Sequence, residues 1–279
     1  MHLRLGSRTL NLDRPRVMGV INVTPDSFSD GGRFLDVDAA VSRAGRMQAA
    51  GADIIDIGGE STRPGAESVP EGEELDRVIP VIEAIAGRGD VVISVDTSKP
   101  AVMRAAVDAG AAMINDVCAL TRDGALESAS ALDVGVCLMH MQGEPRTMQQ
   151  NPAYERFPGD ILAYLSGRVA ACREAGIEAE RIVIDPGFGF GKTHEHNVRL
   201  LADLDRFKAL GMPLLVGLSR KSTLGHLTGK GLDDRLSSGV AAAVMAVERG
   251  ANIVRTHDVG ATVDALRIVD AVMQSGREQ

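Results

Sequence analysis

The sequence predicts a closed (β/α)8 barrel, the TIM-barrel architecture, with a short hairpin at its N-terminus. One pattern recurs: a helical stretch ends at Gly, and a Val/Ile-rich run follows that ends in a polar residue. Gly tolerates the left-handed backbone that ends a helix, and β-branched runs are typical of buried parallel strands. Eight candidate strands fall within residues 17–21, 49–56, 91–95, 108–115, 134–138, 176–185, 211–217 and 250–255. Eight such units in about 250 residues suit one closed barrel, whereas a doubly wound open sheet usually has fewer strands.

The hairpin is the first element expected. Residues 3–12 alternate in polarity and carry Gly6-Ser7 at their middle, so residues 1–14 are predicted to form two short strands around a tight turn. We expect this hairpin to plug the N-terminal mouth, or bottom, of the barrel.

Helical stretches are expected between most of the strands. Residues 97–100 (Thr-Ser-Lys-Pro) predict one helix start, with hydroxyl caps followed by Pro in the first turn. No Pro/Ser-rich linker divides residues 1–279, so a single domain is predicted, with a frayed polar tail at 274–279.

Composition excludes several classes of protein. Of 279 residues, 44% are hydrophobic, which suffices for a large core, and the net charge of −8 leaves no general basic surface for nucleic acid. Three cysteines without a CxxC motif argue against a disulfide framework or a Cys-based zinc site. No apolar run reaches the roughly 18 residues that span a bilayer, and the N-terminus lacks a signal core. We therefore expect a cytoplasmic protein without nucleic-acid or membrane partners.

The predicted strands end in polar side chains, and in a barrel the chemistry belongs to that edge. For any one position a helix cap is an equally good interpretation. Eight together are hard to explain by capping. They are Asn22, residues 60–63, Asp96, residues 115–116, His140, Asp185, residues 219–222 and residues 255–257.

Four of these side chains suit a flat heterocycle: Asp96, Asn115, Asp185 and Lys221. Each follows an apolar run closely, so each should point into a narrow and partly dry mouth, where an unpaired polar group is costly. A carboxylate such as Asp185 can accept two parallel N–H bonds from an aminopyrimidine edge. An internal Asp–Lys ion pair is the alternative.

A second set suits an anion. Thr62, Arg63, Arg255 and His257 form a predicted cationic group in an acidic protein, which indicates a phosphate ligand. Surface arginines paired with nearby acids are the alternative. Asn22 offers a neutral oxygen of the kind that Mg²⁺ accepts beside waters and substrate phosphates.

One glycine-rich segment resembles a known motif without matching it. Residues 187–193 (GFGFGKT) look like a phosphate-binding P-loop, but the first Gly of that motif would fall at Pro186, so the spacing excludes it.

The loops at 24–34 and 61–70 mix Gly and Pro, which favours mobile lids that exclude water; ordinary surface loops are the alternative.

Six sequence strings resemble those of the dihydropteroate synthase family, over residues 17–272. They are NVTPDSFSDGG at 22–32, GGESTRP at 58–64, MHMQG at 139–143, DPGFGFGK at 185–192, SRKS at 219–222 and RTHDV at 255–259. The resemblance implies that 4-aminobenzoate displaces pyrophosphate from 6-hydroxymethyl-7,8-dihydropterin pyrophosphate to give 7,8-dihydropteroate, a folate precursor. It also implies a homodimer and inhibition by sulfonamides.

The resemblance assigns roles to individual residues. Pterin would be held by Asp96, Asn115, Asp185 and Lys221, and pyrophosphate by Thr62, Arg63, Arg255 and His257. Phe28, Pro64, Phe190 and Ser222 would line the 4-aminobenzoate pocket, and Mg²⁺ would lie near Asn22. Asp30, Arg63 and Lys221 would be catalytic, with Asp30 stabilising positive charge on the pterin carbon.

Two other functions stay open from sequence alone. A pterin-binding methyltransferase barrel would share the pterin ligands but has no need for the 219–222 and 255–257 strings. A catalytically silent relative that only binds pterin would be expected to have lost some of Asn22, Asp30, Arg63 and Lys221, all of which are present.

Overall fold

Parallel strands form the centre of the molecule in a computed structural model that describes residues 1–24, 33–63 and 65–276. Within these residues one eight-stranded parallel sheet runs in the order β8-β7-β6-β5-β4-β3-β10-β9. A bridge between Ile184 and Leu214 joins its two edge strands and closes the barrel. The strands are β3 (Arg16–Asn22), β4 (Ile54–Gly58), β5 (Val92–Asp96), β6 (Met113–Asp116), β7 (Gly135–Met139), β8 (Ile182–Asp185), β9 (Leu215–Gly217) and β10 (Ile253–Thr256). Each overlaps a range predicted from sequence, so the fold class is confirmed.

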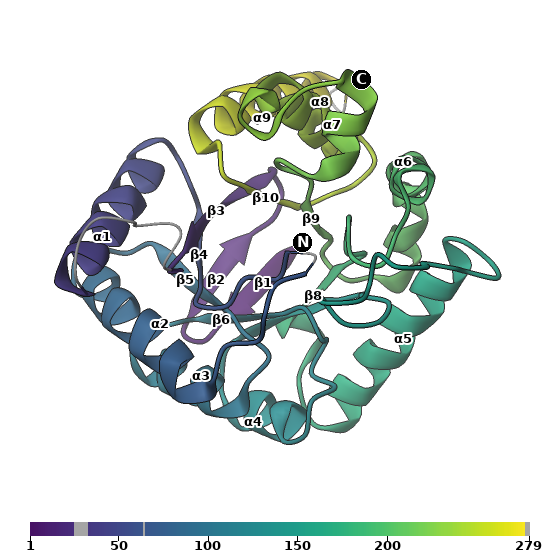
Figure 1. Cartoon of the computed structure of the whole chain (residues 1–279). Coiled ribbons are helices and arrows are strands. Elements are labelled where there is room, and N and C mark those ends of the chain that lie inside the picture. Colours follow the sequence, from purple (N-terminus) through teal and green to yellow (C-terminus); the bar gives the residue numbers. More distant parts are fainter. Residues whose placement is uncertain (25–32, 64, 277–279) are drawn as a thin grey trace.

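Helices form a ring around this barrel (Figure 1). The α-helices are α1 (Arg33–Ala49), α2 (Glu71–Ala86), α3 (Pro100–Asp108), α4 (Ala125–Ala131), α5 (Gly159–Glu174), α6 (His194–Ala202), α7 (Ser222–Thr228), α8 (Leu236–Glu248) and α9 (Val259–Ser275). Short 3₁₀ turns are η2 (Ala179–Arg181), η3 (Leu204–Leu210) and η4 (Leu232–Asp234). In the described part of the chain, no helix is long and apolar enough to cross a membrane.

The strand sequences fill two separate layers because successive side chains point to opposite faces of a sheet. Residues such as Ile55, Ile57 and Val95 point outward and pack with the helices in the main core. The inward positions form a second cluster inside the barrel, with one residue from each strand. They are Met18, Ile54, Val92, Met113, Cys137, Val183, Leu215 and Ile253.

The N-terminal hairpin completes that inner cluster, as the sequence predicts. Strands β1 (His2–Leu5) and β2 (Arg8–Asn11) pair antiparallel, with Leu5 opposite Arg8 and Gly6 at φ +65° in the turn. The side chains of Leu3, Leu5 and Leu12 are buried among the inward residues of the strands. The hairpin therefore covers the end of the barrel at which the strands begin, and leaves the end formed by their carboxyl termini for the site.

One local expectation was wrong. Helix α3 begins at Pro100, but neither Thr97 nor Ser98 caps it, since Lys99 is the N-cap residue and makes no side-chain capping bond. Helix α9 continues through Ser275, and residues 277–279 of the predicted tail lie outside the described residues.

The hairpin should contribute measurably to stability. We expect Leu3→Ala to lower the free energy of unfolding by about 2–5 kcal/mol, because it empties a fully buried position. Leu10→Ala on the same hairpin is the matched control, since Leu10 is only half-buried, and should cost less. Urea denaturation of both variants measures the difference; equal costs would contradict the plug.

Candidate active site

The inward residues at the carboxyl ends of the strands are polar, unlike those below them. Asp96 and Asp185 are the last residues of β5 and β8, Asn115 lies on β6, and Arg255 lies on β10. Asp96, Asn115 and Asp185 are 8%, 5% and 6% exposed. The alternation of each strand aims these groups into the barrel, above the apolar inner cluster. The structure thus brings the predicted heterocycle-binding residues together at one end.

Arg255 is the centre of this polar layer. Its Nε donates to Asp56 Oδ2 at 2.6 Å and its Nη2 donates to Asp96 Oδ2 at 2.8 Å. Asn115 Nδ2 also donates to Asp56 Oδ2, at 3.0 Å. One guanidinium therefore ties β10 to β4 and β5, and partly neutralises two buried carboxylates.

Sequence reasoning missed Asp56 as a site residue. Asp56 is fully buried in the middle of β4, where it pairs in register with Val20 and Ser94. Its Oδ1 has no hydrogen-bond partner among the described residues, and neither has Ser94 Oγ. A carboxylate inside an apolar strand run is costly without a charged partner, and that cost was the signal available in the sequence.

Burial shifts the pKa values of the charged groups in this layer. It raises the pKa of Asp96 to about 7, although the Arg255 guanidinium acts to lower it. Burial also raises the pKa of Asp185 to about 6. The pKa of Lys221 falls to about 8 through burial and the charge of Arg255. Asp185 Oδ1 nonetheless accepts from the Gly187 N–H at 2.7 Å, so burial rather than a missing partner is the main cause of these shifts.

An internal Asp–Lys pair, the alternative considered for these residues, is not what the structure forms. The ion pairs of Asp56 and Asp96 go to Arg255. Lys221 Nζ lies 4.1 Å from the centroid of the Phe190 ring instead, a cation–π contact. Phe190 is thereby placed directly beside the lysine predicted to contact pterin.

The turn after β9 positions Lys221 and Ser222. Arg220 adopts φ +60°, which is unfavourable for a side chain with a Cβ. Its guanidinium donates to Asp258 Oδ1 at 2.8 Å, and its carbonyl oxygen accepts from Arg235 Nη1 at 3.0 Å. Ser222 then begins α7, as predicted, so a helix N-terminus opens near Lys221.

The GFGFGK segment is a tight loop held from within. Lys192 Nζ donates to the carbonyl oxygens of Gly187 and Phe190 and contacts His140 Nδ1, each at 2.9–3.0 Å. A Cβ on Gly187, at φ +73°, would lie 1.9 Å from the His140 carbonyl oxygen. Burial, aided by Lys192, lowers the pKa of His140 to about 3, so this histidine is neutral. The segment supports Phe190 and is no phosphate loop.

The predicted anion group is less cationic than its sequence suggests. Burial, together with arginines 255, 220 and 43, lowers the pKa of His257 to about 3, so it is neutral near pH 7 in this structure. The expectation that His257 contributes positive charge was wrong, because burial first, and then the arginines around it, disfavour the protonated ring. Its Nδ1 lies 3.1 Å from Ser219 Oγ. Thr62 is half-buried and Arg63 is exposed.

The structure describes only some of the other predicted site residues. Asn22 ends β3 opposite Gly58, and the described residues contain no group of three His, Cys, Asp or Glu side chains that could hold a metal ion. A lone amide oxygen fits Mg²⁺ only where phosphates and water supply the other ligands. Phe28, Asp30 and Pro64 lie outside the described residues, as does most of the loop at 24–34.

Known proteins match the whole chain. A sequence model of the family "Pterin binding enzyme" matches residues 18–257. The dihydropteroate synthase of Escherichia coli K12 is 52% identical over 275 residues, covering 99% of this chain and 98% of its own length. A crystal structure of Yersinia pestis dihydropteroate synthase with a sulfonamide drug complex has a TM-score of 0.94 and 51% identity, covering 98% of this chain and 100% of its own. The Xanthomonas albilineans enzyme with 4-aminobenzoic acid has a TM-score of 0.92 and 53% identity, covering 98% of both chains.

The barrel and its polar mouth are those of a pterin-binding enzyme of the (β/α)8 class. Within that class, the chain belongs to the dihydropteroate synthase family.

The charge on Asp56 should be needed for stability. We expect Asp56→Asn, which keeps the side-chain shape, to lower the free energy of unfolding by about 1–3 kcal/mol at pH 7, because Arg255 loses one of two buried counter-charges. Ser94→Ala is the control: it removes a buried hydroxyl that has no partner among the described residues and should be neutral or stabilising. Chemical denaturation of both variants tests this; an undisturbed Asp56→Asn protein would refute it.

Proposed function

We propose that the protein is a dihydropteroate synthase that condenses 6-hydroxymethyl-7,8-dihydropterin pyrophosphate with 4-aminobenzoate. The products are 7,8-dihydropteroate and pyrophosphate. The observation that carries the proposal is the set of Asp96, Asn115 and Asp185, all buried, with the half-buried Lys221 at the barrel mouth, in a chain about half identical to named synthases over almost its full length.

The donors and acceptors of a pterin ring are complementary to the polar side chains of this mouth. The Asp185 carboxylate accepts N–H bonds from the aminopyrimidine edge, while the Asn115 amide can both donate and accept. These bonds would add to the one that Asp185 already accepts from the Gly187 N–H. Lys221 and Asp96 complete the set, and Lys221 links the pterin side to Phe190 and the 4-aminobenzoate side.

The leaving group would be held by Thr62, Arg63, Arg255 and His257. Arg255 already bonds Asp56 and Asp96, so it is oriented in advance rather than recruited by the substrate. A neutral His257 can donate one hydrogen bond to a phosphate oxygen. Mg²⁺, with Asn22 as a protein ligand, would supply further neutralisation of the pyrophosphate charge.

The reaction is proposed to be an SN1-like displacement. The bond between the exocyclic pterin carbon and the pyrophosphate oxygen breaks first, and its electron pair leaves with pyrophosphate. Asp30 would stabilise the resulting cation. The amine nitrogen of 4-aminobenzoate then forms the new C–N bond and loses a proton to solvent. Phe28, Pro64, Phe190 and Ser222 would line its pocket, with the α7 N-terminus at Ser222 facing its carboxylate.

We also propose a cytoplasmic homodimer that sulfonamides inhibit. Large apolar side chains are exposed on α8 and α9, where Met245, Ile268, Val272 and Met273 are 38–68% exposed. Because α8 and α9 pack side by side, this surface could be buried against a second copy. Titration with 4-aminobenzoate should relieve sulfonamide inhibition competitively, since both would occupy the same pocket.

The test of the proposed function is pyrophosphate release from the dihydropterin pyrophosphate with 4-aminobenzoate and Mg²⁺, each component omitted in turn. Dihydropteroate, identified by mass, should form only in the complete mixture. Pterin binding without product would instead indicate a silent relative. If no pterin binds, the assignment of the strand-end residues is wrong.

Lys221 should matter far more than an ordinary surface lysine. We expect Lys221→Ala to lower kcat/KM at least 100-fold, because one change removes a charged contact from both the pterin and the 4-aminobenzoate sides. Lys230→Ala, at an exposed position, should leave kcat/KM unchanged. Steady-state kinetics with each substrate varied provide the measurement; wild-type-like values for Lys221→Ala would remove this residue from the catalytic set.

Pterin affinity should depend on pH through Asp185. Its pKa is about 6 in the free protein, and ligand N–H donors favour the ionised carboxylate. The contribution of Asp185 to binding of 6-hydroxymethylpterin should therefore weaken by up to about tenfold per pH unit as the pH falls below 6, and level off above it, whereas Asp96 and Lys221 titrate at higher pH. Titration calorimetry from pH 5 to 8 measures this. Asp185→Asn should bind more weakly at pH 8 with a shallower pH profile; an unchanged profile would assign the titration elsewhere.

A further inference from the structure

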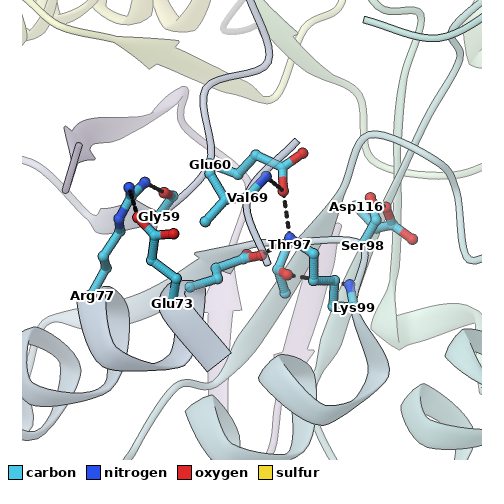
Figure 2. A network of polar contacts seen from close by, with 10 residues as sticks. Gly59, Glu60, Val69, Glu73, Arg77, Thr97, Ser98, Lys99 and Asp116 are labelled. Atoms are coloured by element: carbon cyan, nitrogen blue, oxygen red, sulfur yellow. Dashed lines mark hydrogen bonds and ion pairs between the residues drawn. The ribbon is translucent and has the colours of Figure 1, made fainter. Parts of the chain in front are cut away.

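The segment that joins β4 to α2 carries Thr62 and Arg63, and charged side chains hold both of its ends (Figure 2). At the start, the carbonyl oxygen of Gly59 accepts from Arg77 Nη1 of α2 at 2.7 Å, and Arg77 also pairs with Glu73. At the end, the backbone N–H of Val69 donates to Glu60 Oε2 at 3.3 Å. The Glu60 side chain thus spans the base of the segment.

Lys99 connects this base to two other elements. Its Nζ bonds both Glu60 Oε2 and Glu74 Oε2, and Glu74 lies on α2. The side chains of Lys99, Glu60 and Glu74 are 13%, 19% and 1% exposed. Removing one partner from such a cluster leaves an uncompensated charge with little access to water, which costs more than the loss of a surface ion pair.

The arrangement depends on the ammonium charge. Burial acts to lower the pKa of Lys99, but hydrogen bonds and charge from Glu60 and Glu74 outweigh it and the net pKa is raised. Without that charge, two carboxylates would face each other with Glu74 unable to reach solvent. Repulsion would then drive Glu60 away and break its bond to Val69.

Lys99 is also close to the pterin side of the mouth. It follows Asp96 by three residues, in the connection between β5 and α3. Thr62, Asp96 and Lys99 line one cavity of about 20 Å³, room for about one water molecule. In the same connection, Ser98 bonds Asp116, which also accepts the N–H groups of Cys118 and Leu120 at 2.8 and 2.7 Å. The segment around Lys99 is therefore itself anchored.

We propose that Lys99 is a positioning residue that holds the Thr62–Arg63 segment, through Glu60, at a set position relative to the pterin carboxylate Asp96. This inference deepens the proposed function and rests on it for its kinetic consequences. In this proposal Lys99 acts through Glu60 and not by contact with a substrate. It fixes the pyrophosphate side of the mouth relative to the pterin side.

The test compares Lys99→Met, which keeps the length of the side chain and removes its charge, with Lys99→Arg, which keeps the charge. Lys208→Met, at an exposed position on η3 away from the mouth, is the control. Three quantities are measured: KM and kcat for the pyrophosphate substrate, Kd for 6-hydroxymethylpterin without pyrophosphate, and amide hydrogen exchange at residues 61–63 and 65–69.

We expect Lys99→Met to raise the KM for the pyrophosphate substrate at least tenfold, to change the Kd of 6-hydroxymethylpterin less than twofold, and to speed exchange at residues 61–63 and 65–69. Lys99→Arg should recover most of the KM. Glu60→Gln should move the same quantities in the same direction. This variant tests the proposal in place of Lys99→Met if Lys99→Met fails to fold.

Equal losses of pyrophosphate-substrate and hydroxymethylpterin affinity would overturn the proposal, because they would indicate general damage to the site. Unchanged KM and unchanged exchange would overturn it as well. If the wild-type protein shows no turnover, the proposed function fails, and the exchange and pterin-binding measurements still decide the role of Lys99.

Discussion

The bond between Arg255 and the two carboxylates Asp56 and Asp96 is the interaction on which the site depends. A closed parallel barrel has a dry interior, and this one places acidic side chains on β4, β5 and β8 inside it. A buried carboxylate without a counter-charge would take up a proton. The Arg255 guanidinium supplies that counter-charge and joins three strands with two hydrogen bonds, one to Asp56 and one to Asp96. The polar mouth can therefore exist at the end of an otherwise apolar barrel.

Asp185 and Lys221 lie outside the hydrogen bonds that Arg255 makes. The raised pKa of Asp185 and the lowered pKa of Lys221 both come first from burial. Under the proposed function, a polar ring that bonds these groups would recover part of the free energy that the fold loses in burying them, which is a common relation between stability and function in enzyme sites. The opposite end of the barrel is apolar instead, because the hairpin fills it with leucines.

Charges outside the mouth hold its loops in place. Lys192 ties together the loop that carries Phe190, and the Glu60–Lys99–Glu74 cluster ties the segment that carries Thr62 and Arg63. In both cases a lysine ammonium group donates hydrogen bonds to oxygen atoms. Lys192 donates to two carbonyl oxygens of its own tight loop, and Lys99 donates to two carboxylates from residues distant in sequence. Contacts that hold the loops in this way keep the binding groups within the narrow geometric tolerances that catalysis requires.

The barrel, the hairpin and the polar strand ends could be predicted from the amino-acid sequence, because periodicity, turn residues and the residue at a strand end are local properties. The contact between Asp56, in the middle of an apolar run, and an arginine 199 residues away could not be predicted, since it exists only once the barrel closes. The same holds for Thr97 and Ser98, whose expected helix cap is absent while Ser98 bonds Asp116, and for His257, which burial and nearby arginines keep neutral. Which charges face each other depends on the folded chain, because electrostatic coupling is set by distance and burial rather than by order along the sequence.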